Sequence, residues 1–470
     1  MESNGKESLG NPIPPAEAAL LNSHDQEQDR AADYQVKVYG RRWVMLAIYA
    51  FCATSNAAHW LQFSIIANII IKYYNVSSHA VNWTSMVYMA AYVLLVLPAS
   101  WLLDKKGLKV TLLCGAVLMT AGSWIKVASV ARHLFYVAFL GQTFVGAAQI
   151  FIIGLPARLA AVWFGPDQVS TATAIGVFGI QVGMATGFVI PPAIVGNHED
   201  ADHIGGDLMK LYVGLAVGPT IALLLVIFVF RAAPKLPPSE AQASVKRQEE
   251  KPSYFASLKA LVTNRNFLLL VISYGINMGT FYAVSTLLNQ ILLVYFENSE
   301  ADGGRIGFAM VLAGVFGSVI GGVVLDKTHK FKETSLVVYS MALLGMVGYT
   351  FSFKMGYILI VYAVGAFLGF FITSYLTIGF EFAAELTYPE PEGTSSGLLN
   401  MMAEICGVGF TMITGKLLVS YGDLVTNITM CVMLAAGFVA TMMINGKDLR
   451  RQAASRQLRA PETEMLNIGA

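Results

Sequence analysis

Four residues whose side chains suit the binding of a small cation occur as two pairs in the two halves of the chain. Trp60 and Tyr282 are 222 residues apart, and Gln181 and Glu404 are 223 apart. Aromatic rings attract ammonium groups through cation–π contacts, each worth about 0.5–2 kcal/mol once desolvated. A carboxylate inside an apolar run costs about 2.5–3.5 kcal/mol to insert into a membrane and is therefore expected to face a cavity or a positive charge. The two pairs predict a cation-binding cavity between two related halves.

The same residue types also occur in purely structural roles. Mid-membrane aromatic rings usually serve packing alone, and Glu404 could form an internal ion pair with Lys126 or Arg158, both of which fall within apolar runs. Further polar side chains that could line the same cavity are Gln62 and Asn277.

The elements that must position these side chains are membrane-spanning helices. The chain has 470 residues, of which 55% are hydrophobic and only 13% charged, whereas soluble proteins carry about a quarter charged residues. About twelve runs are long and apolar enough to cross a bilayer as helices, and they are too continuous for barrel strands. These runs cover residues 43–71, 81–103, 108–130, 134–162, 168–195, 208–230, 266–295, 305–325, 334–353, 356–384, 394–420 and 425–445.

We therefore expect an all-α membrane protein with twelve transmembrane helices in two six-helix lobes. Its lobes would cover residues 41–231 and 263–446. A disordered cytoplasmic tail (1–40), a cytoplasmic linker (232–262) and a second cytoplasmic tail (447–470) would complete the chain. A duplicated half of six spans is typical of two-lobed transporters.

A short charged motif repeats after the second and the eighth runs. Asp104-Lys-Lys-Gly107-Leu-Lys109 ends one run, and Asp326-Lys-Thr-His329-Lys ends the other at the same offset of 222 residues. An acidic side chain can meet the positive N-terminal dipole of a helix. We expect Asp104, Lys109, Arg158 and Asp326 to form a cytoplasmic gate, with Asp104 near the eleventh span and Asp326 near the fifth. The alternative is a solvated turn.

Charge and sequence motifs also predict the orientation and narrow the function. Basic residues collect in alternate loops, which makes those loops and both termini cytoplasmic. Sequons at Asn75, Asn82 and Asn427 fall on the outer side and favour the plasma membrane, with the endoplasmic reticulum or mitochondria as alternatives.

The net charge of +1 gives no reason to expect a nucleic-acid partner. The absence of a phosphate-binding loop motif argues against an ATP-driven pump, and we expect neither enzymatic activity nor a cofactor.

Several stretches of this chain resemble the feline leukaemia virus subgroup C receptor-related family of the major facilitator superfamily. The resemblance extends from about residue 40 to 450 and rests on the following motifs: His59-Trp-Leu-Gln-Phe-Ser-Ile-Ile66, Trp83-x-Ser-Met-Val-Tyr-Met89, Trp101-Leu-Leu-Asp104, Gly154-Leu-Pro-x-Arg158, Val162-Trp-Phe-Gly-Pro166, Phe281-Tyr-x-Val-Ser-Thr-Leu-Leu-Asn-Gln290 and Glu392-Gly-Thr-Ser-Ser-Gly-Leu-Leu-Asn400.

The resemblance implies a carrier for choline and ethanolamine that works as a monomer in the lipid bilayer by facilitated diffusion. It implies that Trp60, Tyr282 and Gln181 bind the substrate. The family has glutamine where this chain has Glu404, a departure that suggests modulation by pH. A haem or porphyrin exporter, with His59 as one potential ligand of iron, and a non-transporting receptor are the alternatives.

Overall fold

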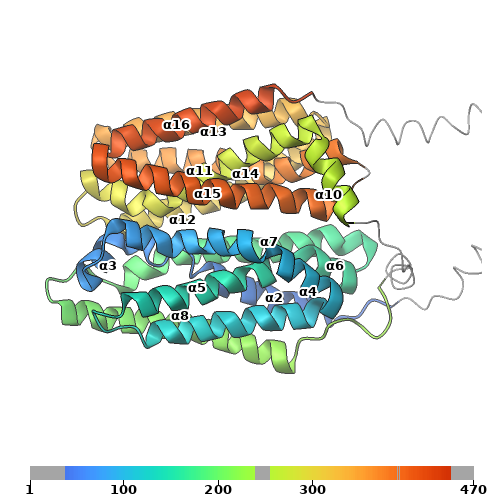
Figure 1. The fold of residues 1–470 in the computed structure, drawn as a ribbon, viewed down its shortest axis with the longest axis horizontal. Helices are drawn as coiled ribbons and strands as arrows, with labels where there is room; N and C mark the ends of the chain where they lie inside the picture. Colours follow the sequence, from blue (N-terminus) through green and yellow to red (C-terminus); the bar gives the residue numbers. More distant parts are fainter. Residues whose placement is uncertain (1–36, 239–253, 389, 391, 446–470) are drawn as a thin grey trace, which may run out of the picture.

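The computed structural model describes residues 37–238, 254–388, 390 and 392–445. Most of the tail predicted at 1–40 and all of the tail predicted at 447–470 lie outside this part of the chain. It is all-helical within these ranges, and its helices form two lobes that lie side by side (Figure 1). Ten of the described helices are long and apolar enough to cross a membrane.

The N-terminal lobe contains the elements from α2 to α8. Their bounds are α2 Arg42–Ala57, η1 Ser64–Ile66, α3 Ala67–Tyr74, α4 Ser78–Val127, α5 Phe135–Ile153, α6 Pro156–Trp163, η2 Pro166–Gln168, α7 Val169–Ile194 and α8 Ala201–Phe228. Helix α4 combines the predicted second and third spans, because the helix continues with a kink at Gly107.

The C-terminal lobe follows the linker. Its elements are α10 Tyr254–Thr263, α11 Arg265–Tyr295, α12 Glu300–Thr328, α13 Phe331–Ser352, η3 Phe353–Met355, α14 Ile358–Thr387, α15 Glu392–Tyr421 and α16 Asp423–Met442. The short helix α10 occupies part of the region predicted as a linker. When α4 is counted twice and the interrupted α2–α3 segment once, the described helices give the twelve predicted spans.

The first span is interrupted, a feature that its hydropathy does not predict. The run predicted at 43–71 is helical in α2, leaves the helix after Ala57, and becomes helical again at η1 and α3. Trp60 therefore lies in the interruption rather than in the middle of a helix. An interruption at membrane depth needs polar groups to bind its free backbone atoms, because lipid offers none. The equivalent seventh span, α11, is one continuous helix of 31 residues.

The duplication extends to turn residues with left-handed backbone conformations. Gly107 (φ 77°) and His329 (φ 52°) occupy the same position of the repeated charged motif, and Asn75 (φ 53°) and Asn298 (φ 57°) follow the first and seventh spans. Gly107 combines this φ with a ψ of −176°, a region that is open only to glycine. This explains the glycine of the motif, because the backbone leaves the helical conformation at Gly107, where the two helical halves of α4 meet at the kink.

The two lobes contact each other through α7 with α12 and α4 with α15, which are equivalent pairs in the duplication. Several side-chain hydrogen bonds join the lobes on the side that the sequence predicts to face outward, from α3 and the loop after α7 to α12, and between α4 and α11. The Glu300 carboxylate accepts from Asn68 (2.7 Å) and Asn197 (3.1 Å). Gln290 donates to Asn82 over 2.7 Å, and the hydroxyls of Ser85 and Thr286 lie 2.9 Å apart. These bonds hold the lobes together on their outer side.

Two of the three predicted glycosylation sites are buried. Asn82 is 3% exposed and its side chain accepts the bond from Gln290, and Asn427 is 0% exposed within α16. An oligosaccharide on either residue would have to fit inside the packed helices, so the structure gives no support to glycosylation at these two positions. Asn75 is exposed at the end of α3 and stays a predicted site.

Candidate functional site

A cavity of about 180 Å³ lies between the two lobes. Side chains from α2, the interruption after it, α4, α5 and α7 line it on one side, and side chains from α11, α14 and α15 line it on the other. Its polar and aromatic lining includes Asn56, Trp60, Tyr88, Tyr92, Gln149, Gln181, Phe281, Tyr282, Phe380, Asn400 and Glu404. Most of the remaining lining is aliphatic or methionine.

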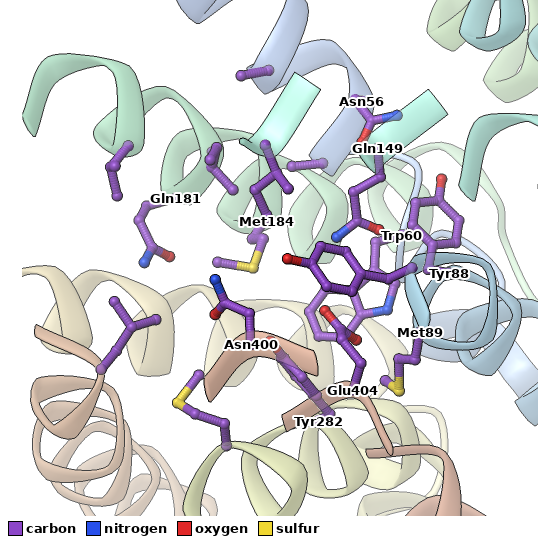
Figure 2. Close-up of a pocket in the computed structure, with 18 of the residues that line it drawn as sticks. Asn56, Trp60, Tyr88, Met89, Gln149, Gln181, Met184, Tyr282, Asn400 and Glu404 are labelled. Atoms are coloured by element: carbon purple, nitrogen blue, oxygen red, sulfur yellow. The ribbon is translucent and has the colours of Figure 1, made fainter. Parts of the chain in front are cut away.

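The repeated aromatic pair meets at this cavity. The rings of Trp60 and Tyr282 have centroids 5.4 Å apart and an interplanar angle of 82°. Edge-to-face contact of this kind stabilises an aromatic pair, and perpendicular rings also form a corner. Figure 2 shows both residues at the cavity, where their π faces can be reached by a molecule inside it. Trp60 is 7% exposed, so little of this surface reaches bulk solvent.

Glu404 brings a carboxyl group into the same part of the cavity. It lies on α15, is 6% exposed, and lies near Trp60 and Tyr282 in Figure 2. Tyr92 and Tyr282 line the same cavity. Within the described part of the chain, its carboxyl oxygens have no hydrogen-bond donor and no basic partner. A buried carboxylate without a partner is unfavourable, so the site is complete only with a bound proton or cation.

The other predicted cavity residues differ in position. Gln181 lines the cavity but lies well away from Trp60 in Figure 2, near the opposite end. Gln62 does not line it, because its amide bonds to Gln142 inside the N-terminal lobe. Asn277 is 0% exposed and also lies outside the lining, and neither atom of its amide has a partner among the described residues. In this structure neither Gln62 nor Asn277 faces the cavity, and their predicted role in substrate binding stays a prediction.

The basic residues considered as partners of Glu404 are elsewhere. The Lys126 ammonium group lies 2.8 Å from His59 Nδ1 and 3.0 Å from Gln142 Oε1 within the N-terminal lobe. Arg158 is exposed on α6 rather than buried in the fourth span. The alternative of an ion pair between either residue and Glu404 is thus not seen.

The predicted cytoplasmic gate is only partly described. Lys109 donates to the Ile227 carbonyl oxygen over 3.2 Å, which places its charge at the C-terminal end of α8 in its own lobe, a favourable position for a cation. Asp104 is exposed and has interaction partners, and the side chain of Asp326 lies outside the described part of the chain. The helix pairs that the gate requires, α4 with α15 and α7 with α12, do pack together. The gate itself stays a prediction.

Gln149 and Tyr88 were not predicted as cavity residues. Gln149 lies on α5, and its Oε1 is buried without a partner among the described residues, as is the hydroxyl of Tyr88 on α4. The sequence could have indicated Gln149 as a cavity residue, because an amide side chain within an apolar run is rare at membrane depth without a function. Tyr88 gave no such signal, since tyrosine is common near membrane surfaces.

Comparison with known proteins agrees with this geometry. Residues 46–411 match the model of the Major Facilitator Superfamily. The chain is 48% identical over 422 residues to the choline/ethanolamine transporter flvcr2a of Danio rerio, covering 90% of each protein. It is 45% identical to the choline/ethanolamine transporter FLVCR2 of Homo sapiens, covering 90% of this chain and 80% of that protein.

The chain belongs to the FLVCR family of the Major Facilitator Superfamily. Another relative, the choline/ethanolamine transporter FLVCR1 of Felis catus, is 46% identical over 89% of this chain and 75% of its own length. The FLVCR-family chain is thus a multi-pass membrane transporter and not an enzyme.

Solved structures of other facilitators share the fold of this FLVCR-family chain. A bacterial homologue of the human lysosomal transporter Spinster aligns with a TM-score of 0.66 at 13% identity, covering 86% of this chain and 94% of that one. The Escherichia coli fucose:proton symporter FucP aligns with a TM-score of 0.57 at 12% identity, covering 86% and 100%. At these identities the likeness concerns the fold alone.

Proposed function

We propose that this protein carries choline and ethanolamine across a membrane by facilitated diffusion, with uptake modulated by pH. The observation that carries the proposal is the partnerless Glu404 carboxyl group beside the Trp60–Tyr282 corner in an interlobe cavity, within the part of the chain that the structure describes. The relatives named choline/ethanolamine transporters support the same substrates.

The substrate's ammonium group would lie against the two aromatic faces and balance the charge of Glu404. Cation–π contacts reach about 2 kcal/mol or more when the site is desolvated, and Trp60 is buried while Tyr282 is half-buried. Glu404 would strengthen the attraction, because a carboxylate in a site of low polarity interacts more strongly with a cation than it would in water. Gln181, at the other end of the cavity, would receive the hydroxyl group.

The size of the cavity agrees with a small substrate. An enclosed apolar cavity of about 150 Å³ accommodates benzene, and choline is only slightly larger than benzene. The cavity between the lobes is about 180 Å³.

A haem is several times larger than this cavity, so the export of haem would need a different conformation. Iron also needs axial ligands, and His59, the histidine suggested for this role, lies behind the lining and bonds to Lys126. No observation on the described residues favours haem or a non-transporting receptor over a small cation.

Transport would follow alternating access. In the present conformation the lobes are held together at their outer ends by the bonds to Glu300, Asn82 and Ser85. To admit substrate from outside, those bonds must break while the lobes approach on the cytoplasmic side. We propose that the protein works as a monomer with both termini in the cytoplasm, and that the exposed Asn75 reflects delivery to the plasma membrane.

The test is uptake of radiolabelled choline by liposomes that contain the purified protein. We expect saturable uptake that follows the choline gradient and is inhibited by ethanolamine. Liposomes with a Glu404→Gln, Trp60→Ala double variant serve as the control. Absence of uptake by the wild-type protein, in liposomes shown to contain folded protein, would overturn the proposal.

A further inference from the structure

A buried polar network lies behind Trp60, outside the cavity. Its members are Lys126, Gln142, His59, Gln62 and Ser123, all of them 1% exposed or less. They come from the second half of α4, from α5 and from the interruption of the first span. Nothing in the proposed transport function uses them, yet burying a lysine in a membrane-spanning lobe is costly.

Gln142 joins this network to the interrupted backbone. Its Nε2 donates to the His59 carbonyl oxygen over 2.9 Å and lies 3.5 Å from the carbonyl oxygen of Trp60. His59 and Trp60 lie beyond the end of α2, and carbonyl groups in the interruption of a membrane span cannot bond to lipid. Gln142 therefore binds the backbone on which the Trp60 ring is carried.

Lys126 determines which way the Gln142 amide points. An ammonium group only donates hydrogen bonds, so the Gln142 atom 3.0 Å from Lys126 Nζ must be the oxygen. Gln62 Nε2 donates to the same oxygen over 2.9 Å. With its oxygen held by two donors, Gln142 directs its NH₂ group toward the free carbonyls. Without Lys126, the amide could turn over and place its oxygen against them.

Lys126 lies where α4 and α5 approach closely. At Gly141 on α5, an added Cβ would lie 2.6 Å from the Gly122 carbonyl oxygen and 2.7 Å from Lys126 Cγ, so this glycine leaves room both for the neighbouring backbone and for the lysine stem. His59 completes the network. Its Nδ1 faces Lys126 at 2.8 Å and its Nε2 faces the Ser123 hydroxyl at 3.2 Å. Since Ser123 donates to the Met119 carbonyl oxygen over 2.7 Å, it can accept from His59 Nε2–H. In that tautomer Nδ1 accepts from Lys126 and makes no hydrogen bond with the Gln62 Oε1 atom, 3.3 Å away, because both are acceptors.

We propose that Gln142 and Lys126 are positioning residues for substrate binding, which act by fixing the interrupted backbone at Trp60 and thereby its ring in the cavity. This inference rests on the proposed function, because it assumes that the Trp60 ring contacts the substrate. Lys126 specifies the orientation of Gln142, and Gln142 holds Trp60.

Two variants test the role of Gln142 separately from stability. Gln142→Glu keeps a partner for Lys126 but cannot donate to the carbonyls of His59 and Trp60. The double variant Lys126→Met, Gln142→Met removes the buried charge together with its partner, a change that can be nearly neutral for stability. Thr143→Val on the same helix is the matched control, because the Thr143 hydroxyl donates to the Phe139 carbonyl oxygen within α5.

Choline affinity is measured on each purified variant, together with its melting temperature and the KM and maximal rate of uptake. We expect Gln142→Glu and the double variant to remain folded, with affinity lowered and KM raised about fivefold to tenfold, the effect of losing one or two hydrogen bonds. The maximal rate should change less than KM, and Thr143→Val should match the wild type. Wild-type affinity in folded Gln142→Glu and double-variant proteins would overturn the proposal, as would failure of both to fold.

A double-mutant cycle shows whether Gln142 acts through Trp60. In a Trp60→Ala background, Gln142→Glu should lower affinity no further, because the ring it positions is gone. An additive loss would contradict the proposal. The cycle also separates the two hypotheses. If the wild-type protein neither binds nor transports choline, the proposed function fails. If it does, and Trp60→Ala loses binding while Gln142→Glu does not, only the positioning role fails.

Discussion

The first and seventh spans are copies of one another in the duplicated fold, yet the first is interrupted at Trp60 and the seventh continues through Tyr282 as α11. The two rings meet at the same corner of the cavity, but they are held in different ways. Tyr282 is fixed by a regular helix, whose backbone groups bond to one another. Trp60 depends on Gln142, Lys126 and Gln62, which bond around an irregular backbone.

This difference shows how a symmetric fold can form an asymmetric site. A continuous helix holds a side chain firmly and moves only with its lobe. An interrupted segment leaves backbone groups that other side chains must bind, so its position can change without moving the whole lobe. Trp60 is therefore the more adjustable of the two rings. We expect its removal to lower choline affinity more than the removal of Tyr282 does.

Trp60→Ala should lower choline affinity by about 30-fold, the equivalent of about 2 kcal/mol of cation–π attraction. Isothermal titration of choline into the purified variant measures this directly. Trp60→Phe, which keeps an aromatic face, is the control and should recover part of the affinity. Wild-type affinity in Trp60→Ala would remove the aromatic corner from the site.

Tyr282→Ala should lower choline affinity by about tenfold, because one of the two rings is lost while the helix that carries it persists. Tyr282→Phe keeps the π face and should stay within about twofold of the wild type in the same titration. A loss in Tyr282→Ala larger than that in Trp60→Ala would reverse the ranking of the two spans.

Glu404→Gln should lower the affinity for choline severalfold and flatten the dependence of uptake on pH. A carboxyl group attracts the cation only when ionised, so wild-type uptake should rise with pH, whereas the amide has no charge to lose. Uptake measured across a pH series in liposomes checks this, with Asn400→Asp as a control that adds a carboxyl group elsewhere in the cavity. Identical profiles for the wild type and Glu404→Gln would exclude a role for this charge.

Substitutions in the turns that follow the first and seventh spans are expected to have the smallest effect on transport. Asn75 and Asn298 share the left-handed conformation, but only Asn75 is part of a sequon. If the protein is glycosylated, Asn75→Gln should abolish the shift in mobility caused by glycosidase and leave choline uptake within about twofold. Asn82→Gln and Asn427→Gln should leave the shift intact. A shift that survives Asn75→Gln would place the oligosaccharide elsewhere.

Much of the fold could be predicted from the sequence, because length and hydropathy determine which segments can span a bilayer. The predicted runs agree with the helix bounds of α7, α11, α13 and α16 to within a few residues. The offset between the halves also paired Trp60 with Tyr282 correctly, since residues at the same depth of equivalent helices face the same interface.

The sequence could not show which polar side chains turn toward the cavity. Gln62 and Asn277 have the same chemistry as Gln149, and Lys126 was a reasonable partner for Glu404. Their directions depend on how each helix is rotated against its neighbours, and hydropathy carries little information about rotation in helices that are apolar on most sides.

The sequence by itself determined a two-lobed helical membrane protein, with its aromatic pair and its carboxyl group at matching depths, because these follow from the composition and the repeat. Only the tertiary structure decided that the first span is interrupted at Trp60, and that Lys126 serves Gln142 rather than Glu404. The physical reason is that an interrupted backbone in a membrane is stable only where packed neighbours supply its missing hydrogen bonds, and those neighbours lie about 65–85 residues away along the chain.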